Sequence, residues 1–235
     1  MCAAITGVTP EYGLLLEQNR AGDVLIQVEA DVDSEYDYEL LGYITPKKMG
    51  QAYHCPVFNG LSKQTTSEQL MDLGTQLNIH GIVPMFHVVG VTPEAADVHT
   101  AFLGRKDPPV VTITNEDLAQ ARAEISAGTG KADFCILGCP HLTINQVGSI
   151  AKMLDGQQLA GQLYIFTSTS TKELAQRMGY LDIIHKAGGE IVINSCVDQP
   201  CWSHLYGMSG VTESPKCAYY TKRWNMTFTV KSIPA

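Results

Sequence analysis

Charged residues are scarce in this sequence, and what it lacks excludes several classes of protein. Asp, Glu, Lys and Arg make up 17% of its 235 residues, against roughly 25% in a typical soluble domain. So few charges are typical of a chain that hides part of its surface against another chain, and a homo-oligomer is one such arrangement. The net charge of −8, without any cluster of Lys or Arg, argues against a nucleic-acid groove.

Long apolar runs are also missing. The longest, Ile82–Val91, is interrupted by Pro84 and His87, and it is far shorter than the roughly 20 residues of a membrane-spanning helix. The first residues, MCAAITGVTPEYG, lack the basic and then apolar layout of a secretory signal. Seven cysteines without regular spacing fit a reducing compartment, where thiols stay free or bind metals. We therefore expect a cytoplasmic protein with no membrane or nucleic-acid partner.

Hydrophobic residues make up 45% of the chain, enough for a large core. From Ile79 onward, short apolar runs alternate with amphipathic segments. We predict strands at 82–91, 110–113, 134–137, 163–166 and 190–194. Helices are predicted to follow the capping residues Thr92, Thr114, Thr143 and Ser170. This repetition predicts βαβ units and a three-layer α/β fold, in which helices cover both faces of a mostly parallel sheet.

The pattern is weaker upstream of residue 79. We predict a strand at 23–28, a helix that begins near Thr65, a loop-rich stretch at 31–61, and an edge strand at 226–230. The chain thus divides into an N-terminal loop-rich α/β portion, residues 1–78, and a parallel βα core with a C-terminal extension, residues 79–235. A single continuous domain is the alternative.

Nearly all the reactive side chains follow predicted strands. Ligands of open parallel sheets bind at the carboxyl ends of the strands, so we expect four loops to meet at one edge. These loops carry His87, Gly90 and Thr92; Cys139, Pro140 and His141; Thr167, Ser168, Thr169 and Ser170; and Ser195, Cys196 and Asp198. Two of them lead into helix N-termini, whose unpaired N–H groups favour a carboxylate or a phosphate.

Cys139 and Cys196 follow two of the predicted strands in equivalent positions. A thiol before a helix N-terminus is stabilised as the thiolate, so two such thiols on neighbouring loops are candidate ligands for iron or zinc. The alternative is that Cys139 is a small residue in a tight turn. Cys201 is a further candidate ligand in a structural zinc site, although its spacing from Cys196 is weakly specific. Cys135 is expected to point into the core.

Other candidates each have a structural alternative. His141 is a candidate general acid or base, or else a structural hydrogen-bonding group. The hydroxyls at 167–170 suit an anion, but they also serve as ordinary helix caps. His87 lies on an apolar strand, where a histidine more often satisfies its hydrogen bonds within the core. Ser214 and Lys216 place a hydroxyl and a cation in one loop, which suits an anion.

Several segments resemble the large subunit of the aconitase X family. They are AAITGVTPEYG at the start, FHVVGVTPEA at 86–95, ILGCPHLT at 136–143, IFTSTS at 165–170, AGGEIVINSC at 187–196 and SPKCAYY at 214–220. They occur in family order over essentially the whole chain. The family comprises hydro-lyases, namely cis-3-hydroxy-L-proline dehydratases of bacteria and phosphomevalonate dehydratases of archaea.

The resemblance implies an aconitase-like catalytic domain and the iron-dependent dehydration of a small hydroxy-carboxylate. It matches Cys139 and Cys196 to cluster-ligand cysteines, and leaves open a 2Fe-2S cluster, a 4Fe-4S cluster or mononuclear iron. It matches Ser214 and Lys216 to a Ser-x-Lys segment that looks like a substrate-binding element. We expect catalytic roles for these two residues and for His141. We expect further residues to bind the small anionic substrate, namely Thr6, Gly7, His87, Thr92, Thr167 and Ser168.

Some features depart from the family pattern. Family large subunits carry a further stretch ahead of AAITG, with another ligand cysteine. The glutamate that usually follows GCPH is replaced around Asn145 and Gln146, and Pro215 stands where a small residue is expected. We therefore expect a fragment, one half of a split enzyme, or a relative that has lost catalysis. Activity would need the missing N-terminal portion and a small swivel-domain subunit. The alternative is a non-catalytic anion-binding or assembly subunit on the same scaffold.

Overall fold

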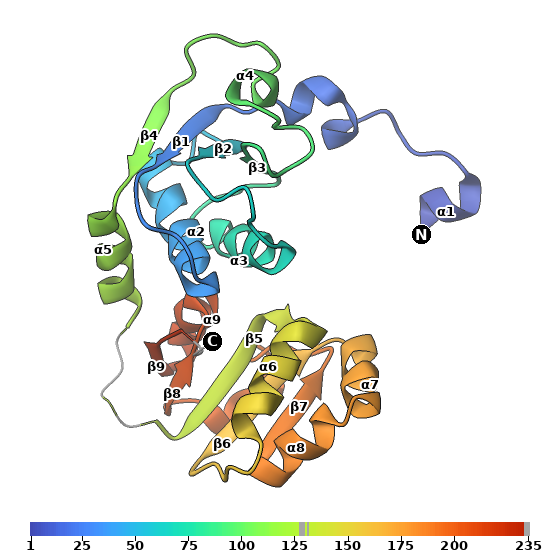
Figure 1. The fold of residues 1–235 in the computed structure, drawn as a ribbon, viewed down its shortest axis with the longest axis vertical. Coiled ribbons are helices and arrows are strands. Elements are labelled where there is room, and N and C mark those ends of the chain that lie inside the picture. Colours follow the sequence, from blue (N-terminus) through green and yellow to red (C-terminus); the bar gives the residue numbers. More distant parts are fainter. Residues whose placement is uncertain (127–129, 131, 233–235) are drawn as a thin grey trace.

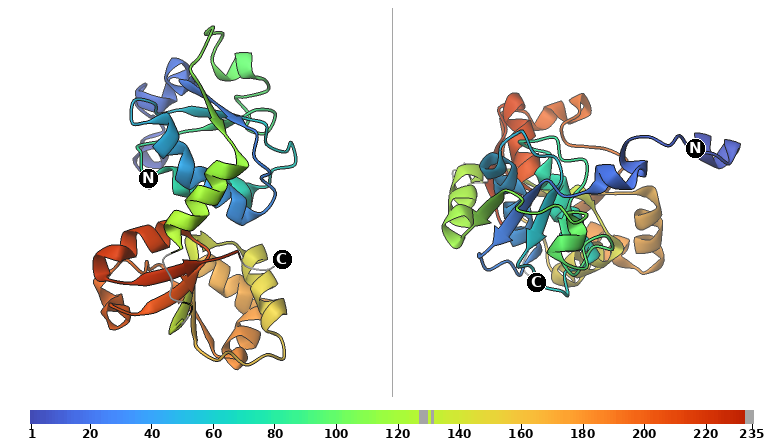
Figure 2. Two further views of the ribbon diagram at one scale, coloured as in Figure 1. Left: turned by 90° about the vertical axis from the view of Figure 1, so that its left-hand side faces the viewer. Right: turned by 90° about the horizontal axis from the view of Figure 1, so that it is seen from above.

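Two all-parallel sheets, each with its own helices, form the computed structural model, which describes residues 1–126, 130 and 132–232 (Figure 1). The first sheet has the strand order β3-β2-β1-β4, and the second has the order β7-β6-β5-β8-β9. The predicted α/β class is confirmed, with two parallel sheets where one was expected. Two units, each built on one sheet, lie one above the other along the long axis (Figure 2).

The first unit is built on β1 (Val24–Val28), β2 (Pro56–Asn59), β3 (His87–Val88) and β4 (Val110–Ile113). Its main helices are α2 (Glu35–Met49), α3 (Ser67–Leu77), α4 (Val98–Ala101) and α5 (Asn115–Ile125). They are preceded by α1 (Cys2–Thr6) and two 3-10 turns, η1 (Gly13–Leu15) and η2 (Glu17–Arg20). Helix α1 is exposed and lies away from the body of the molecule (Figures 1 and 2).

The second unit is built on β5 (Phe134–Leu142), β6 (Gln162–Thr167), β7 (Gly189–Ile193), β8 (Ser209–Thr212) and β9 (Thr227–Val230). Its helices are α6 (Ile144–Leu154), α7 (Thr169–Arg177), α8 (Tyr180–Ala187) and α9 (Pro215–Thr221). Two 3-10 segments, η3 (Pro200–Leu205) and η4 (Lys222–Trp224), complete it. The edge strand expected at 226–230 is confirmed as β9. In the described part of the chain, no helix is long and apolar enough to cross a membrane.

The capping residues predicted the starts of four helices to within two residues. Helices α5 and α6 begin directly after Thr114 and Thr143, as predicted. Helix α3 is capped by Thr66, one residue later than expected. Helix α7 begins earlier than predicted, because Ser168 rather than Ser170 caps it. A run of adjacent hydroxyls offers several caps, so sequence alone does not select between them.

Two predictions around residue 90 were wrong. The strand expected at 82–91 is reduced to the two residues of β3, and Ile82 is 78% exposed. Pro84 has no N–H to give to a ladder, which limits pairing on that side. No helix begins after Thr92, because its hydroxyl is hydrogen-bonded to the backbone of Val88 in a turn. The helix of this region, α4, begins after Asp97 instead.

The stretch at 31–61 is not loop-rich, because it contains α2 and β2. Helix α2 is buried on nearly every side. It therefore lacks the apolar and polar alternation by which an amphipathic helix is found in a sequence. The strands change sheet between β4 and β5, so the boundary expected at residues 78 and 79 falls within the first sheet. The strand–helix alternation continues across that change, and thus does not mark it.

The two units share one apolar core. Buried residues of β9, among them Phe228 and Val230, belong to the same cluster as Tyr36 and Leu40 of α2. The Tyr36 hydroxyl also donates to the carbonyl oxygen of Val230 at 3.3 Å. Burial of this apolar surface holds the units together and brings the starts of α2 and α3 next to the second sheet.

Candidate active site

The GCPH segment, residues 138–141, belongs to β5 and is not the loop that was expected after Leu137. The register of β5 against β6 shifts between Leu137 and Leu142. Gly138 has φ +108°, and a Cβ there would lie 2.2 Å from the carbonyl oxygen of Phe166. Only glycine allows this close approach. It positions the Cys139 thiol at the carboxyl edge of the second sheet.

Three thiols lie near that edge. Burial raises the pKa of Cys139 to about 11, and charges on Glu213 and Cys196 act in the same direction. Burial also raises the pKa of Cys217, on which both other thiols act. Among residues 1–126, 130 and 132–232, however, no three His, Cys, Asp or Glu side chains are grouped as metal ligands. The described residues therefore do not form a metal site by themselves.

Glu213 is a charged group beside the thiols that the sequence interpretation missed. Its carboxylate accepts the N–H of Gly138 at 2.6 Å. Burial nevertheless raises the pKa of Glu213, although backbone N–H groups, including that of Cys139, act to lower it. Glu213 directly follows β8, where parallel sheets bind ligands. A prediction of β8 would therefore have indicated it.

Ser214 and Lys216 are held in place by Gln76 of the first unit. The Gln76 amide donates to the Ser214 hydroxyl at 3.3 Å, and it accepts the backbone N–H of Lys216 at 2.9 Å. The Lys216 ammonium donates to the carbonyl oxygen of Thr75 at 3.4 Å. A hydrogen bond from Ser214 and the charge of Lys216 both lower the pKa of Cys139, against the larger effect of burial. The structure therefore brings together three of the residues singled out in the sequence.

His141 joins the ends of β5 and β7. Its Nε2 atom lies 2.8 Å from the carbonyl oxygen of Ser195. A carbonyl only accepts, so this bond places the imidazole proton on Nε2 and leaves Nδ1 as an acceptor. The Trp202 indole donates to the Ser195 hydroxyl at 3.1 Å. These bonds hold the segment that leads to the exposed Cys196.

Thr167 and Ser168 lie at the same edge, but their hydroxyls are already engaged. Thr167 is buried and donates to the carbonyl oxygen of Leu142 at 2.6 Å. The Ser168 hydroxyl accepts the N–H of Thr171 at 3.2 Å, as the cap of α7. Ser168 thus has the capping role that the sequence offered as the alternative, and Thr167 instead links β6 to β5.

Four residues expected to bind substrate lie elsewhere. His87 is buried on β3, and its Nε2 atom lies 2.7 Å from the carbonyl oxygen of Arg20. Thr92 also belongs to the first unit, because β3 pairs with β2. Thr6 and Gly7 lie at the end of the exposed α1 (Figure 1). The expectation of four loops at one edge was therefore wrong for the loop that carries His87.

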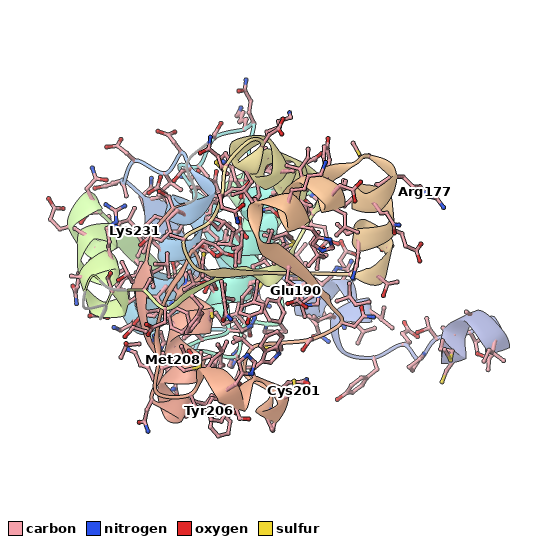
Figure 3. The ribbon with its side chains drawn as sticks, turned by 90° about the horizontal axis from the view of Figure 1, so that it is seen from below. Arg177, Glu190, Cys201, Tyr206, Met208 and Lys231 are labelled. Atoms are coloured by element: carbon pink, nitrogen blue, oxygen red, sulfur yellow. The ribbon has the colours of Figure 1, made fainter. Side chains whose placement is uncertain are left out.

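Cys201 and Cys135 are the other thiols that the sequence singled out. Cys201 is exposed on η3, on the face of the second unit seen in Figure 3. No three potential ligands are grouped anywhere in the described ranges, so a zinc site on Cys196 and Cys201 gains no support. Cys135 is half-buried, and burial raises its pKa to about 12.

Each of the two units matches its own family model. Residues 22–123 match a model of the aconitase X second domain, and residues 132–234 match a model of the aconitase X third domain. The phosphomevalonate dehydratase large subunit of Methanothermobacter thermautotrophicus is 35% identical over 94% of this chain and 53% of its own length. The cis-3-hydroxy-L-proline dehydratase of Pseudomonas aeruginosa is 33% identical over 85% of this chain and 36% of its own length.

A solved structure agrees with these matches. The crystal structure of Thermococcus kodakaraensis aconitase X (holo-form) superposes with a TM-score of 0.84 and 31% sequence identity, over 98% of this chain and 58% of that one. This chain spans about half the length of the large subunits that it matches. Two domain models in family order and one fold over nearly all residues lead to one conclusion: the chain belongs to the aconitase X family.

Proposed function

We propose that this chain is a component of a cytoplasmic, iron-dependent dehydratase. Its substrate would be a small hydroxy-carboxylate such as cis-3-hydroxy-L-proline or 5-phosphomevalonate, the compounds in the names of its relatives. Because the chain covers about half of those large subunits, the active enzyme would also include the remaining catalytic portion and a small swivel subunit.

The observation that carries this proposal is the group formed by Cys139, Cys196, Ser214 and Lys216 at the edge of the second sheet. Thiolates are soft ligands that suit iron and iron–sulfur clusters. The serine and the lysine supply a hydroxyl and a cation for the carboxylate or phosphate of a substrate. Few other structural roles would gather two thiols, a hydroxyl and an ammonium at the carboxyl edge of a parallel sheet.

The donor set fits iron in part. Cys139 and Cys196 would be two of its ligands. Burial raises the pKa of Cys139, Ser214 and Lys216 partly offset that increase, and a bound metal would stabilise the thiolate. The remaining ligands would come from outside the described residues, in which no three ligands are grouped. When bound, iron supplies a Lewis acid for the departing hydroxyl group.

The residues of this chain would perform the other steps. Lys216 and Ser214 would bind the substrate anion and orient the carbon that loses its proton. His141 would accept that proton at Nδ1, since Nε2 is engaged with the carbonyl oxygen of Ser195. The N–H groups at the start of α7 would add positive potential at the same edge.

Metal analysis of the assembled enzyme tests the proposal. The chain would be purified anaerobically together with the remaining portion and the small subunit. We expect iron and absorbance between about 300 and 450 nm, typical of thiolate-bound iron, and dehydration of one of the two named substrates. Cys139→Ser and Cys196→Ser should each lose most of the iron and the activity.

The matched control is Cys201→Ser, which changes an exposed thiol of the same unit outside the proposed site. It should retain the iron content and the activity of the unchanged enzyme. An iron-free, colourless complex with all portions present would refute the proposal. So would a Cys139→Ser enzyme that keeps both iron and activity, and that result would favour an anion-binding or assembly subunit.

A further inference from the structure

A cavity of about 430 Å³ lies between the two units, and Glu213 is among the residues that line it. The first turns of α2, α3 and α6 form much of its wall. Five carboxyl groups line it, those of Glu35, Glu39, Glu68, Asp72 and Glu213, and no Lys, Arg or His is among its described lining residues. Tyr36, Pro140, Leu142 and Ile150 supply apolar wall.

Four of the carboxyl groups form two pairs, and each pair would be unfavourable if both of its members were ionised without a compensating group. Glu35 and Glu39 lie one turn apart on α2, and Glu68 and Asp72 lie one turn apart on α3. Like charges at this spacing destabilise a helix. Here the pairs from two adjacent helices line one cavity, and Glu213 adds a further carboxyl from the second unit.

Three of these carboxylates have hydrogen-bond donors from neighbouring side chains. Glu35 accepts from Gln146 at 2.7 Å, Glu68 accepts from Asn145 at 3.2 Å, and Glu39 accepts from Gln76 at 3.1 Å. Glu35 and Glu68 also lie in the first turns of their helices, where the helix dipole favours a negative charge. Glu213 accepts a backbone N–H.

Asp72 is different. It is only 4% exposed, it lines the cavity, and no hydrogen-bond donor reaches it from the described residues. Burial raises the pKa of Asp72 to about 8, and the charges of Glu35, Glu213 and Glu68 add to the increase. A buried carboxyl without a partner is costly. The donor that it lacks would have to come from the cavity.

We propose that this cavity binds a small organic cation, an ammonium group on a compact apolar body, with Asp72 accepting its hydrogen bond. The cavity offers no cationic side chain to an anion among its described lining residues, and its carboxyls repel an anion when they are ionised. A directly coordinated metal ion does not fit, because no three ligands are grouped in the residues that the structure describes. The volume and the apolar wall suit a carbon skeleton of a few atoms. Binding requires neither iron nor turnover, so this inference stands apart from the dehydratase proposal.

Calorimetric titration of the purified chain with cyclopentylamine tests the proposal. Cyclopentanol, which has the same carbon skeleton without the charge, is titrated in parallel at pH 8 and constant ionic strength set with KCl. We expect the amine to bind and the alcohol to bind about tenfold more weakly, since one charge-assisted hydrogen bond is lost. Asp72→Asn should weaken amine binding by about the same factor.

Asp155→Asn is the matched control, because it makes the same change at an exposed position that does not line the cavity. It should bind the amine as the unchanged chain does. Ser149→Phe is a second test, since Ser149 lines the cavity from α6 and a ring there would fill it. This variant should bind neither compound.

The proposal is overturned by any of three results. These are equal binding of the amine and the alcohol, unchanged amine binding by Asp72→Asn, or no amine binding by the folded chain. The melting temperature of each variant without ligand confirms that it is folded. Asp72→Asn removes a buried charge, so we expect it to be at least as stable as the unchanged chain at pH 8.

Discussion

The contacts of several site residues form only where the two units pack together. Cys139 was identified in the sequence because it was expected to follow a strand, and a charge on Cys196 acts on its pKa. Glu39, Asp72 and Gln76 were not identified. Glu39 falls in the stretch that was predicted to be loop-rich, and the predicted helix of Asp72 and Gln76 gave no sign of a role in the site. Gln76 contacts both Glu39 and Ser214 only because the two units pack together.

Asp72 predicts how stability depends on pH. Its pKa is about 8 in the folded chain, against 3.8 as the ordinary value. Between these values the folded chain holds a proton on Asp72 that the unfolded chain releases, so the contribution of Asp72 to stability is fully present below about pH 4 and is lost as the pH rises toward 8. One such proton contributes at most about 1.4 kcal/mol per pH unit.

Thermal melting from pH 5 to 9 measures this effect. The melting temperature should fall with rising pH, and it should fall less steeply in Asp72→Asn. Glu35, Glu39, Glu68 and Glu213 face the same cavity, and burial raises the pKa of Glu39 and Glu213 too. Some slope should therefore persist in the variant. An identical slope in both proteins would contradict the assigned pKa.

At the scale of elements, the sequence was informative wherever the pattern is local. The predicted boundaries of strand β4 and the predicted starts of helices α5 and α6 agree closely with the structure, because capping and periodicity depend on residues that are near one another in the sequence. Helix α2 was missed because it is buried nearly all round. The partition of the strands between two sheets depends on pairing between distant segments, which a single sequence does not show.

Strand β5 carries a prediction at this scale. Gly138→Ala would put a Cβ 2.2 Å from the carbonyl oxygen of Phe166, at a φ of +108° that side chains rarely adopt. We expect a loss of stability of about 2 kcal/mol or more and displacement of the Cys139 thiol. Urea denaturation measures the first effect, and the rate of thiol alkylation measures the second.

Gly156→Ala is the control for this variant. Gly156 also has a positive φ of +72°, but nothing lies within 4 Å of its added Cβ. It should therefore show the cost of the backbone conformation without the clash. Equal destabilisation by the two variants would mean that the approach of β5 to Phe166 is not what requires glycine at residue 138.

At the scale of the whole molecule, the shared core makes the two units one cooperative structure. Tyr36 of α2 packs in the same apolar cluster as β9 and donates to the carbonyl oxygen of Val230. Tyr36→Ala should cost about 3 kcal/mol, in the range of large-to-small core changes. Because the core is common to both units, amide protons of β1 and of β6 should both exchange faster in this variant.

Tyr12→Ala, the same change on the exposed N-terminal segment, should leave the exchange of both strands unaffected. Faster exchange in only one of the two strands would show that the units unfold separately.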